Sequence, residues 1–354
     1  MTGVSFVIPV HNGRAHLRQT LVSVLAQADG RPFEILLIDD GSVDGGVESV
    51  RDLITGAPAS VLRSDGRGAA AAINLGILRA RYPIVCQVDQ DVTLEAGWLP
   101  GLLKAFDDPA VGAAQGQYIT DPTAPVLARV MGRDLEQRYA AIETETDHVC
   151  TGNAAYRLAA LKAVGPFDEG LGYGYDNDMS YRLRAAGFRL ALCRDARSIH
   201  HWRTGVSGYF RQQYGFGYGR LDLVAKHPSR LGGDAVSPLS MMLHPVGMLL
   251  AMAGLGIGLS QGGTAARVGL TIAAALLSVL VVERTLAGVA AARRFRDWSA
   301  LLFPIVHLIR DVAWVCAMLM WSVRRMTRLG SEPRHSMSPA SRDPRPRRDV
   351  TPAE

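Results

Sequence analysis

The sequence is poor in cysteine and has no cysteine motif. Its four cysteines, Cys86, Cys150, Cys193 and Cys316, lie far apart and form no Cys-x-x-Cys pair. This spacing excludes a disulfide framework and a cysteine zinc site, and it is typical of free thiols in a reducing compartment. The N-terminus has no basic stretch and no long apolar run, so we expect no signal peptide and a first domain that stays in the cytoplasm.

Two phosphate-binding signatures are also missing. No G-x-G-x-x-G follows the first apolar run, because Gly66-Arg67-Gly68 lacks a third glycine and comes after a later run. There is no P-loop lysine either. These absences argue against nicotinamide cofactors and against P-loop phosphoryl transfer.

Apolar and charged residues divide the chain into three parts. Residues 1–231 have the pattern of an α/β domain, residues 238–323 are strongly apolar, and residues 324–354 are basic, with eight Arg against four acidic residues. Because this last part is rich in Pro, Ser and Arg, we expect a disordered tail that is a candidate for contact with anionic lipid. It has no interleaved aromatic residues, which argues against nucleic acid.

The first part alternates short apolar runs with segments of helical periodicity. This alternation predicts an α/β fold with a mostly parallel sheet and helices on both faces. Asp44 is the expected N-cap of the second helix. The predicted strands are 4–10, 33–38, 59–63 and 84–88, and the predicted helices are 17–25, 44–54 and 69–80.

Polar residues follow the strands and gather where such sheets bind ligands, beyond the carboxyl ends of the strands. Asp89 and Asp91 are two residues apart, so in an extended segment they face one side. Two neighbouring carboxylates repel each other unless a cation lies between them, and a hard divalent ion carrying a diphosphate meets that need. The alternative is a solvated aspartate pair in a turn. His11, Asp39 and Asp40 fall at the same predicted edge.

Several motifs, in order over residues 4–220, resemble those of family 2 glycosyltransferases. The resemblance implies a GT-A fold, Rossmann-like, followed here by membrane helices, in a membrane-anchored bacterial enzyme. The matching segments are residues 4–12, 34–44, 68–76 with Asn74, 88–91, 151–153, 165–169 and 175–182.

The resemblance also assigns a donor side and a divalent metal, Mn²⁺ or Mg²⁺. Asp91 would hold the metal on the diphosphate, and Asp89 would contact the ribose or a water on the metal. Of the pair His200-His201 we favour His201 as a further metal contact, although a structural histidine is the alternative. The residues implied in contact with the nucleotide-sugar are Pro9, His11, Asn12, Asp39, Asp40, Asn74 and Asp89.

On the acceptor side the resemblance implies a general base. Asp176 is the expected base, and direct displacement with one base implies inversion at the anomeric carbon. Asp178 is the alternative base or the N-cap of a helix over 179–186. Gly152, Asn153 and Tyr175 would line the acceptor site.

Three departures from the family pattern bear on specificity. Tyr175 replaces the usual Glu before the base, and His11 stands where an aromatic residue is common. The segment 212–219 lacks the Gln-x-x-Arg-Trp signature of processive synthases, which argues for one sugar per encounter. Arg203, Tyr209 and Arg211 are candidates for contact with a diphosphate or a lipid head group.

Three apolar stretches, 239–259, 268–292 and 299–323, are long enough to reach across a bilayer. Basic residues at 293–296 and in the tail, with the positive-inside rule, place the catalytic domain, this loop and the tail in the cytoplasm. Two spans and an interfacial third helix satisfy this, since His307, Arg310 and Asp311 share one helix face; three spans are the alternative. We therefore expect a multi-pass protein of the cytoplasmic membrane and a lipid-linked or envelope acceptor.

Three other functions compete with this one. A polyprenyl-phosphate glycosyltransferase, in which a phosphate attacks, needs little help from Asp176. A non-catalytic, membrane-anchored subunit would bind nucleotide-sugars without turnover, but the complete set of Asp89, Asp91 and Asp176 argues against it. A nucleotidyltransferase would need a Gly-rich basic loop after the first strand, and residues 11–14 are a poor version of one.

Overall fold

The computed structural model describes residues 1–327, so the predicted basic tail lies almost entirely outside the described residues. The predicted α/β fold is confirmed. One mostly parallel sheet has the strand order β3-β2-β1-β4-β7-β6-β8-β5. The strands are β1 (Val4–Val10), β2 (Phe33–Asp39), β3 (Ala59–Arg63), β4 (Ile84–Val88), β5 (Val92–Leu94), β6 (Val111–Ile119), β7 (Asn153–Arg157) and β8 (Arg189–His200).

The first four strands are those that the apolar runs predict. β1 pairs in parallel with β2 and with β4, and β2 pairs in parallel with β3. Their runs are continuous rather than alternating because helices cover both faces of the sheet. Since the pairing is parallel, the carboxyl ends of β1, β2 and β4 lie at one edge, which brings the predicted polar residues together.

Helices form a layer on each face of this sheet. α1 (Leu17–Leu25) and α4 (Trp98–Leu103) pack in one core cluster, while α3 (Ala69–Arg79), α6 (Leu158–Val164) and α7 (Tyr175–Ala185) pack against the other face. The predicted helix over 44–54 is wrong in extent. Only a 3₁₀ turn at Glu48–Val50 and α2 (Arg51–Ile54) form, and the Asp44 carboxylate instead accepts hydrogen bonds from the N–H groups of Arg14 and Gly46.

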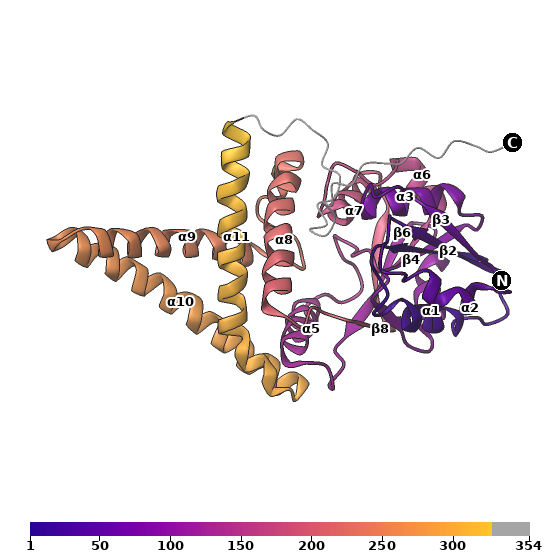
Figure 1. Ribbon diagram of the computed structural model, residues 1–354, viewed down its shortest axis with the longest axis horizontal. Coiled ribbons are helices and arrows are strands. Elements are labelled where there is room, and N and C mark those ends of the chain that lie inside the picture. The colour runs from indigo at the N-terminus through magenta and orange to yellow at the C-terminus, as the bar shows by residue number, and fades with distance from the viewer. Residues whose placement is uncertain (328–354) are drawn as a thin grey trace, which may run out of the picture.

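The C-terminal part consists of long helices that stand apart from the sheet (Figure 1). α5 (Val126–Tyr139) and α8 (Val206–Lys226) connect the two parts. α9 (Leu239–Ser260) and α10 (Gly263–Phe295) form an antiparallel hairpin that projects away from the sheet, and α11 (Phe303–Met326) crosses it and runs beside α8. By length and composition α9, α10 and the segment Trp298–Met326 are each able to cross a membrane.

α11 differs from the hairpin in what surrounds it. Half of its most apolar window is buried in the protein, compared with 22% for α9 and 17% for α10. Its polar residues His307, Arg310 and Asp311 share one face, as predicted, but this face is buried. Arg284 of α10 pairs there with Asp311. This polar face of α11 therefore packs against the rest of the protein and does not face water.

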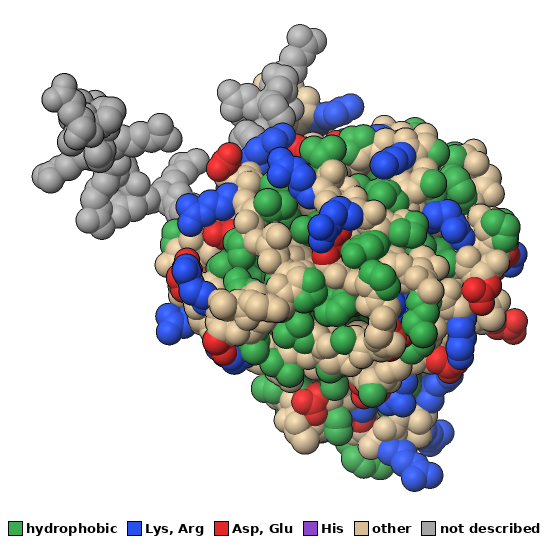
Figure 2. All heavy atoms as spheres, turned by 90° about the vertical axis from the view of Figure 1, so that its right-hand side faces the viewer, with side chains coloured by type: hydrophobic (Ala, Val, Ile, Leu, Met, Phe, Trp, Pro, Cys, Tyr) green, Lys and Arg blue, Asp and Glu red, His purple; other side chains and the backbone are tan. Residues whose placement is uncertain are grey.

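The face of the sheet domain opposite the hairpin looks different (Figure 2). Basic and acidic side chains both occur on it, with apolar side chains nearer its middle. A surface with both signs of charge is typical of contact with water. The molecule thus has a water-facing end and an apolar end, and α5 and α8 lie between them.

Candidate active site

Asp89 and Asp91 follow β4 and lie at the carboxyl edge of the sheet. The Gln87 side chain donates a hydrogen bond of 2.8 Å to Asp89 Oδ1, and the Asp89 N–H donates to the Gly152 carbonyl at 3.2 Å. Gly152 has φ of +91°, and any Cβ there would collide with the Asp89 carboxylate. Glycine is required at this position both for its backbone conformation and for the space it leaves.

A histidine completes this cluster because β5 follows directly after Asp91. β5 pairs antiparallel with the end of β8, with Val92 opposite His200. This pairing brings His200 Nε2 to 3.8 Å from Asp91 Oδ1. Asp89, Asp91 and His200 each offer an atom, and the three atoms lie within 4.8 Å of one another.

The preference for His201 as the metal contact is wrong in this structure. Side chains alternate along an extended chain, so His200 and His201 point in opposite directions. The His201 ring stacks on His16 at 4.4 Å, and its Nε2 lies 2.9 Å from Thr93 Oγ1. Sequence alone did not separate the two histidines because the choice depends on the pairing of β5 with β8.

The charges of the cluster suit a divalent cation. Burial, together with the nearby Asp91 carboxylate, raises the pKa of Asp89 to about 7. Burial lowers the pKa of His200, which keeps its ring neutral and able to act as a ligand near neutral pH. Two crowded carboxylates and a neutral imidazole, all half-buried, fit the predicted metal.

We predict different effects for the two histidines. His200→Ala should weaken the binding of Mn²⁺ by at least about tenfold, because it removes one of three ligands. His201→Ala is the matched control and should change the affinity by less than about twofold. Titration calorimetry of Mn²⁺ into each purified variant measures both values, and a larger loss in His201→Ala would contradict the assignment of His200.

Asp176 lies on the first turn of α7, beside Tyr175. The helix begins at Tyr175, four residues earlier than predicted. Both residues line a cavity of about 390 Å³ that also reaches Asp89, Asp91 and His200. Burial raises the pKa of Asp176, an effect that nearby His148 partly offsets. A carboxyl group with a raised pKa beside a metal cluster is suited to accept a proton.

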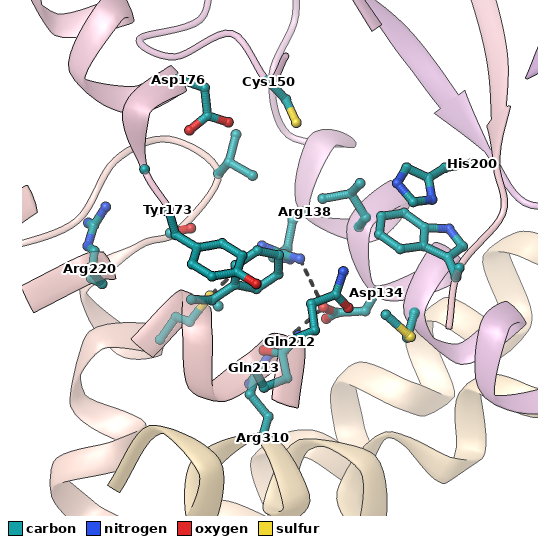
Figure 3. Close-up of a pocket in the computed structure, with 18 of the residues that line it drawn as sticks. Asp134, Arg138, Cys150, Tyr173, Asp176, His200, Gln212, Gln213, Arg220 and Arg310 are labelled. Carbon is teal, nitrogen blue, oxygen red and sulfur yellow. Dashed lines mark hydrogen bonds and ion pairs between the residues drawn. The ribbon is translucent and has the colours of Figure 1, made fainter. Parts of the chain in front are cut away.

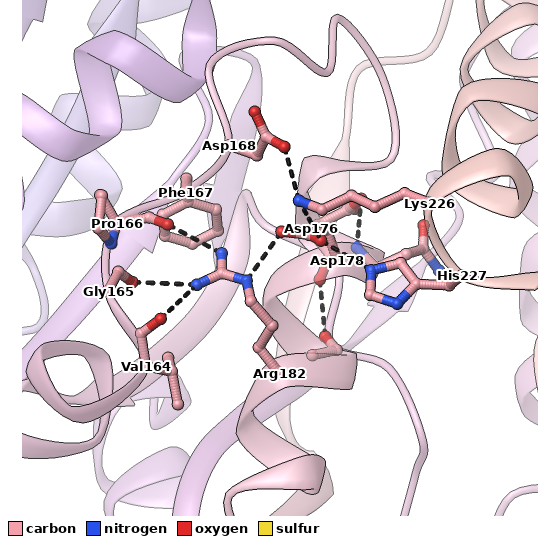
Figure 4. A network of polar contacts seen from close by, with 12 residues as sticks. Val164, Gly165, Pro166, Phe167, Asp168, Asp176, Asp178, Arg182, Lys226 and His227 are labelled. Atoms are coloured by element: carbon pink, nitrogen blue, oxygen red, sulfur yellow. Dashed lines mark hydrogen bonds and ion pairs between the residues drawn. The ribbon is translucent and has the colours of Figure 1, made fainter.

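Asp178 does not reach this cavity. It is not an N-cap either, because it lies inside α7, whose N-cap is Gly174. Its side chain is fully buried and pairs with Arg182 at 2.9 Å, Lys226 at 2.7 Å and His227 at 2.8 Å (Figure 4). Asp178 therefore ties the end of α8 to α7, which is a structural role.

The far end of the cavity is formed by two residues that the sequence did not single out, Asp134 and Arg138, together with Arg310 (Figure 3). α5 contributes Asp134 and Arg138, which pair at 3.1 Å, and α11 contributes Arg310, which lies 3.8 Å from Asp134. Burial alone would raise the pKa of Asp134, but the cations around it hold that pKa well below its usual range. The i, i+4 spacing of Asp134 and Arg138 was a visible signal, although it did not show that they face a cavity.

Of the three candidate contacts past β8, the structure places two at the cavity. Arg203 and Tyr209 line it, whereas Arg211 is exposed and does not. The glutamines Gln212 and Gln213 also line it, and Figure 3 shows both on α8. The cavity is thus bounded by the sheet edge, α5, α7, α8 and the C-terminal helices.

Five of the predicted nucleotide contacts form a second group, outside the cavity, at the ends of β1 and β2. His11 Nδ1 lies 2.8 Å from the Asp40 carbonyl, and the Asn12 N–H donates to Ser42 Oγ at 3.1 Å. Asp40 is buried and accepts hydrogen bonds from Ser64 Oγ and from the Gly68 N–H. Pro9 lies in β1 opposite Ile38, and Asp39 accepts from the Ser42 N–H at 2.9 Å.

Two other predicted contacts make hydrogen bonds within the fold. Asn74 exchanges hydrogen bonds with the backbone of Phe167, at 2.8 and 2.9 Å, and fixes the segment before α7. Asn153 is fully buried, and its Oδ1 accepts a hydrogen bond of 2.6 Å from Trp98 Nε1. Neither side chain lines the cavity.

Comparison with known proteins agrees with this fold. Residues 5–165 match the family described as glycosyl transferase family 2. Pre-mycofactocin glycosyltransferase of Mycobacterium tuberculosis is 30% identical over 249 residues, which are 68% of this chain and 51% of that protein. Succinoglycan biosynthesis protein ExoA of Rhizobium meliloti is 26% identical over 262 residues, which are 71% of this chain and 79% of that protein.

Among solved structures, a mannosyltransferase from Pyrobaculum calidifontis in complex with GDP-Man and Mn²⁺ has the same fold, with a TM-score of 0.59 and 20% identity over 90% of this chain and 86% of that one. The fold and the acidic edge of the sheet define a glycosyltransferase of the GT-A type. The chain contains a glycosyl transferase family 2 domain at residues 5–165. It spans about half the length, 51%, of the first of these relatives.

Proposed function

We propose that the protein transfers one sugar per encounter, with inversion, from a nucleotide-sugar to a hydroxyl of a lipid-linked or envelope acceptor. The observation that carries the proposal is the single cavity that extends from Asp89 and Asp91, past Asp176, to the C-terminal helices (Figure 3). The relatives support it, since one is a glycosyltransferase and another acts in succinoglycan biosynthesis. The structural neighbour was solved with a nucleotide-sugar.

Asp89, Asp91 and His200 would hold the divalent metal, Mn²⁺ or Mg²⁺. When bound, the metal supplies a Lewis acid for the departing nucleoside diphosphate. The nucleoside would lie over the ends of β1 and β2, where backbone and side-chain groups are already fixed by hydrogen bonds. The proposed contacts there are Pro9, His11, Asn12, Asp39 and Asp40.

Asp176 would take the proton from the acceptor hydroxyl as its oxygen attacks the anomeric carbon. Tyr175 lines the cavity beside it, and Gly152 shapes the approach to Asp89. Attack from the acceptor side, opposite the departing diphosphate, inverts the configuration of the sugar. The absence of the processive signature in α8 supports transfer of a single sugar.

The walls of the cavity favour an amphiphilic acceptor. Its apolar lining includes Met241 and Met242 of α9 and Trp314 of α11. An acceptor on a hydrophobic carrier would pass these residues on its way from the membrane.

A second candidate function is transfer to an acceptor phosphate, which would then be the nucleophile. Four arginines that line the cavity favour it: Arg138, Arg203, Arg220 and Arg310.

The test of the transferase is donor hydrolysis by the full chain in detergent. A panel of UDP-, GDP- and dTDP-sugars with Mn²⁺ or Mg²⁺ should include a donor from which sugar is released, and EDTA should stop the release. Tight nucleotide binding with no release, also in the presence of a membrane extract that supplies acceptors, would contradict the proposal and favour a binding subunit.

Membrane attachment follows from the apolar helices, and we propose two spans, α9 and α10, with α11 in the plane of the membrane surface. The direction of α11, across the hairpin, supports this (Figure 1). Apolar residues are exposed near both ends of α11, among them Ile305, Leu319 and Met320, and they would enter the bilayer from the side. The catalytic domain and the C-terminus would then both lie in the cytoplasm.

The topology makes a simple prediction. Two reporters are fused after Ala353, one that is active only in the cytoplasm and one that is active only outside it. The first should be active and the second inactive. The same pair of reporters inserted between Gln261 and Gly262, at the tip of the hairpin, should give the opposite result. Activity of the external reporter after Ala353 would contradict two spans and favour three.

A further inference from the structure

A second pocket lies on the other side of α5 from the catalytic cavity. It has a volume of about 240 Å³ and forms where α10 ends and the chain turns into α11. Three arginines and one aspartate line it, so its lining carries a net positive charge. The lining residues are Pro122, Arg129, Arg133, Phe295, Arg296, Asp297, Trp298 and Ser299.

Two buried polar atoms in this pocket lack a hydrogen-bond partner among the described residues. One is Nε of Arg129, and the other is Oγ of Ser299, a residue that is only 7% exposed. Arg129 and Arg133 flank the single carboxylate, Asp297, at 3.6 and 3.1 Å. Arg133 also pairs with Glu136 at 2.9 Å, and Arg129 Nη1 donates to the Pro122 carbonyl at 3.3 Å. Arg129 Nε and Ser299 Oγ remain without a partner, and an oxyanion would satisfy them.

The surroundings of the pocket indicate where that oxyanion comes from. α10 carries an apolar stretch able to cross a membrane, and its last turn ends in Arg293 and Arg294. At the pocket, Trp298 is 71% exposed, and just beyond it Leu301 and Ile305 are exposed as well. Basic residues next to an exposed tryptophan and aliphatic side chains, at the end of a membrane helix, are typical of the membrane–water interface.

We infer that this pocket binds the phosphate of an anionic phospholipid head group. The arginines and Ser299 would hold the phosphate, and Trp298 with the exposed aliphatic residues would lie against the acyl chains. A free phosphate ion would explain the arginines but would leave the exposed apolar side chains without a role. The inference concerns a site separate from the catalytic cavity and does not depend on the donor or the acceptor.

The site has a consequence for the fold because α5 connects it to the catalytic cavity. Arg129 and Arg133 lie on one face of α5, and Val130 and Asp134 on the neighbouring face line the catalytic cavity. A bound head group would fix α5 against the end of α10. The lipid would thereby hold one wall of the catalytic cavity in place.

The test is lipid binding by the full chain in detergent, followed by native mass spectrometry. Phosphatidylglycerol and phosphatidylcholine with the same acyl chains are titrated separately. Wild type should bind phosphatidylglycerol more tightly, and Arg296→Gln should weaken that binding about fivefold, the usual effect of one arginine at an anionic membrane surface. Arg296 is exposed and has no ion pair within residues 1–327, so its replacement should not affect folding.

Two controls locate the site and identify the ligand. Arg267→Gln, at the other end of α10, is equally exposed and should leave binding unchanged. Trp298→Ala should weaken lipid binding, and millimolar inorganic phosphate should not displace the lipid. Equal binding of the two lipids, an equal loss in Arg267→Gln, or displacement by inorganic phosphate would each overturn the inference.

Discussion

Replacing Asp91 by alanine should abolish metal-dependent sugar release, with a fall in kcat/KM of at least about 10³-fold. The magnitude follows from the several kcal/mol that a metal contributes when charge develops on a leaving group. Asp91 lies 3.8 Å from His200 and close to Asp89, so its removal leaves only two of the three ligand atoms. The loss should be larger than that of any other single substitution in the cluster.

The measurement is release of the sugar from the preferred donor at several Mn²⁺ concentrations. Asp52→Ala is the control, because Asp52 is an exposed carboxylate in a surface pair with Arg18, and such pairs contribute little to stability. Raising the Mn²⁺ concentration should not restore Asp91→Ala. Full activity of Asp91→Ala at ordinary Mn²⁺ concentrations would show that the proposed metal site is wrong.

Much of the sheet could be predicted because its signals are local. The apolar runs at 4–10, 59–63 and 84–88 form strands with the same bounds. The parallel pairing places the polar residues that follow these strands at one edge of the sheet. Asp89 and Asp91 could be identified from this pattern alone. Each of these inferences depends on neighbouring residues and on the period of two in a strand.

The rest of the site depends on contacts between distant parts of the chain. His200 reaches Asp91 only through the pairing of the three-residue strand β5 with β8, and so short a strand gives almost no periodic signal. Asp134 and Arg310 are far apart in sequence and meet because α11 packs on α5. Asp178 resembled a cap or a base, and only the contacts from the end of α8 show its structural role.

The second large effect is expected for Asp176→Asn. If Asp176 is the general base, transfer to a hydroxyl acceptor should fall by about 10²–10⁴-fold, the usual contribution of a positioned base. Asparagine has the same shape but cannot take a proton. Binding of the nucleotide-sugar and of Mn²⁺ should stay close to wild type, since Asp176 lies on α7 and outside the metal cluster. Asp178→Asn is an instructive comparison, because it should lower the melting temperature and leave the pH dependence of the folded enzyme unchanged.

The pH dependence separates a hydroxyl acceptor from a phosphate acceptor. Burial raises the pKa of Asp176, and the group works as a base only when it is deprotonated. With a hydroxyl acceptor, kcat/KM of wild type should therefore fall as the pH drops through this raised pKa, at a higher pH than for an ordinary aspartate. At saturating Mn²⁺, which keeps the Asp89 carboxylate ionised, the acid limb should disappear in Asp176→Asn, whose small residual rate should be flat over that range. A phosphate nucleophile is already ionised near neutral pH and needs no base. Substantial activity of Asp176→Asn with an unchanged pH profile would therefore identify the acceptor as a phosphate. Asp176 would then have no role as a base.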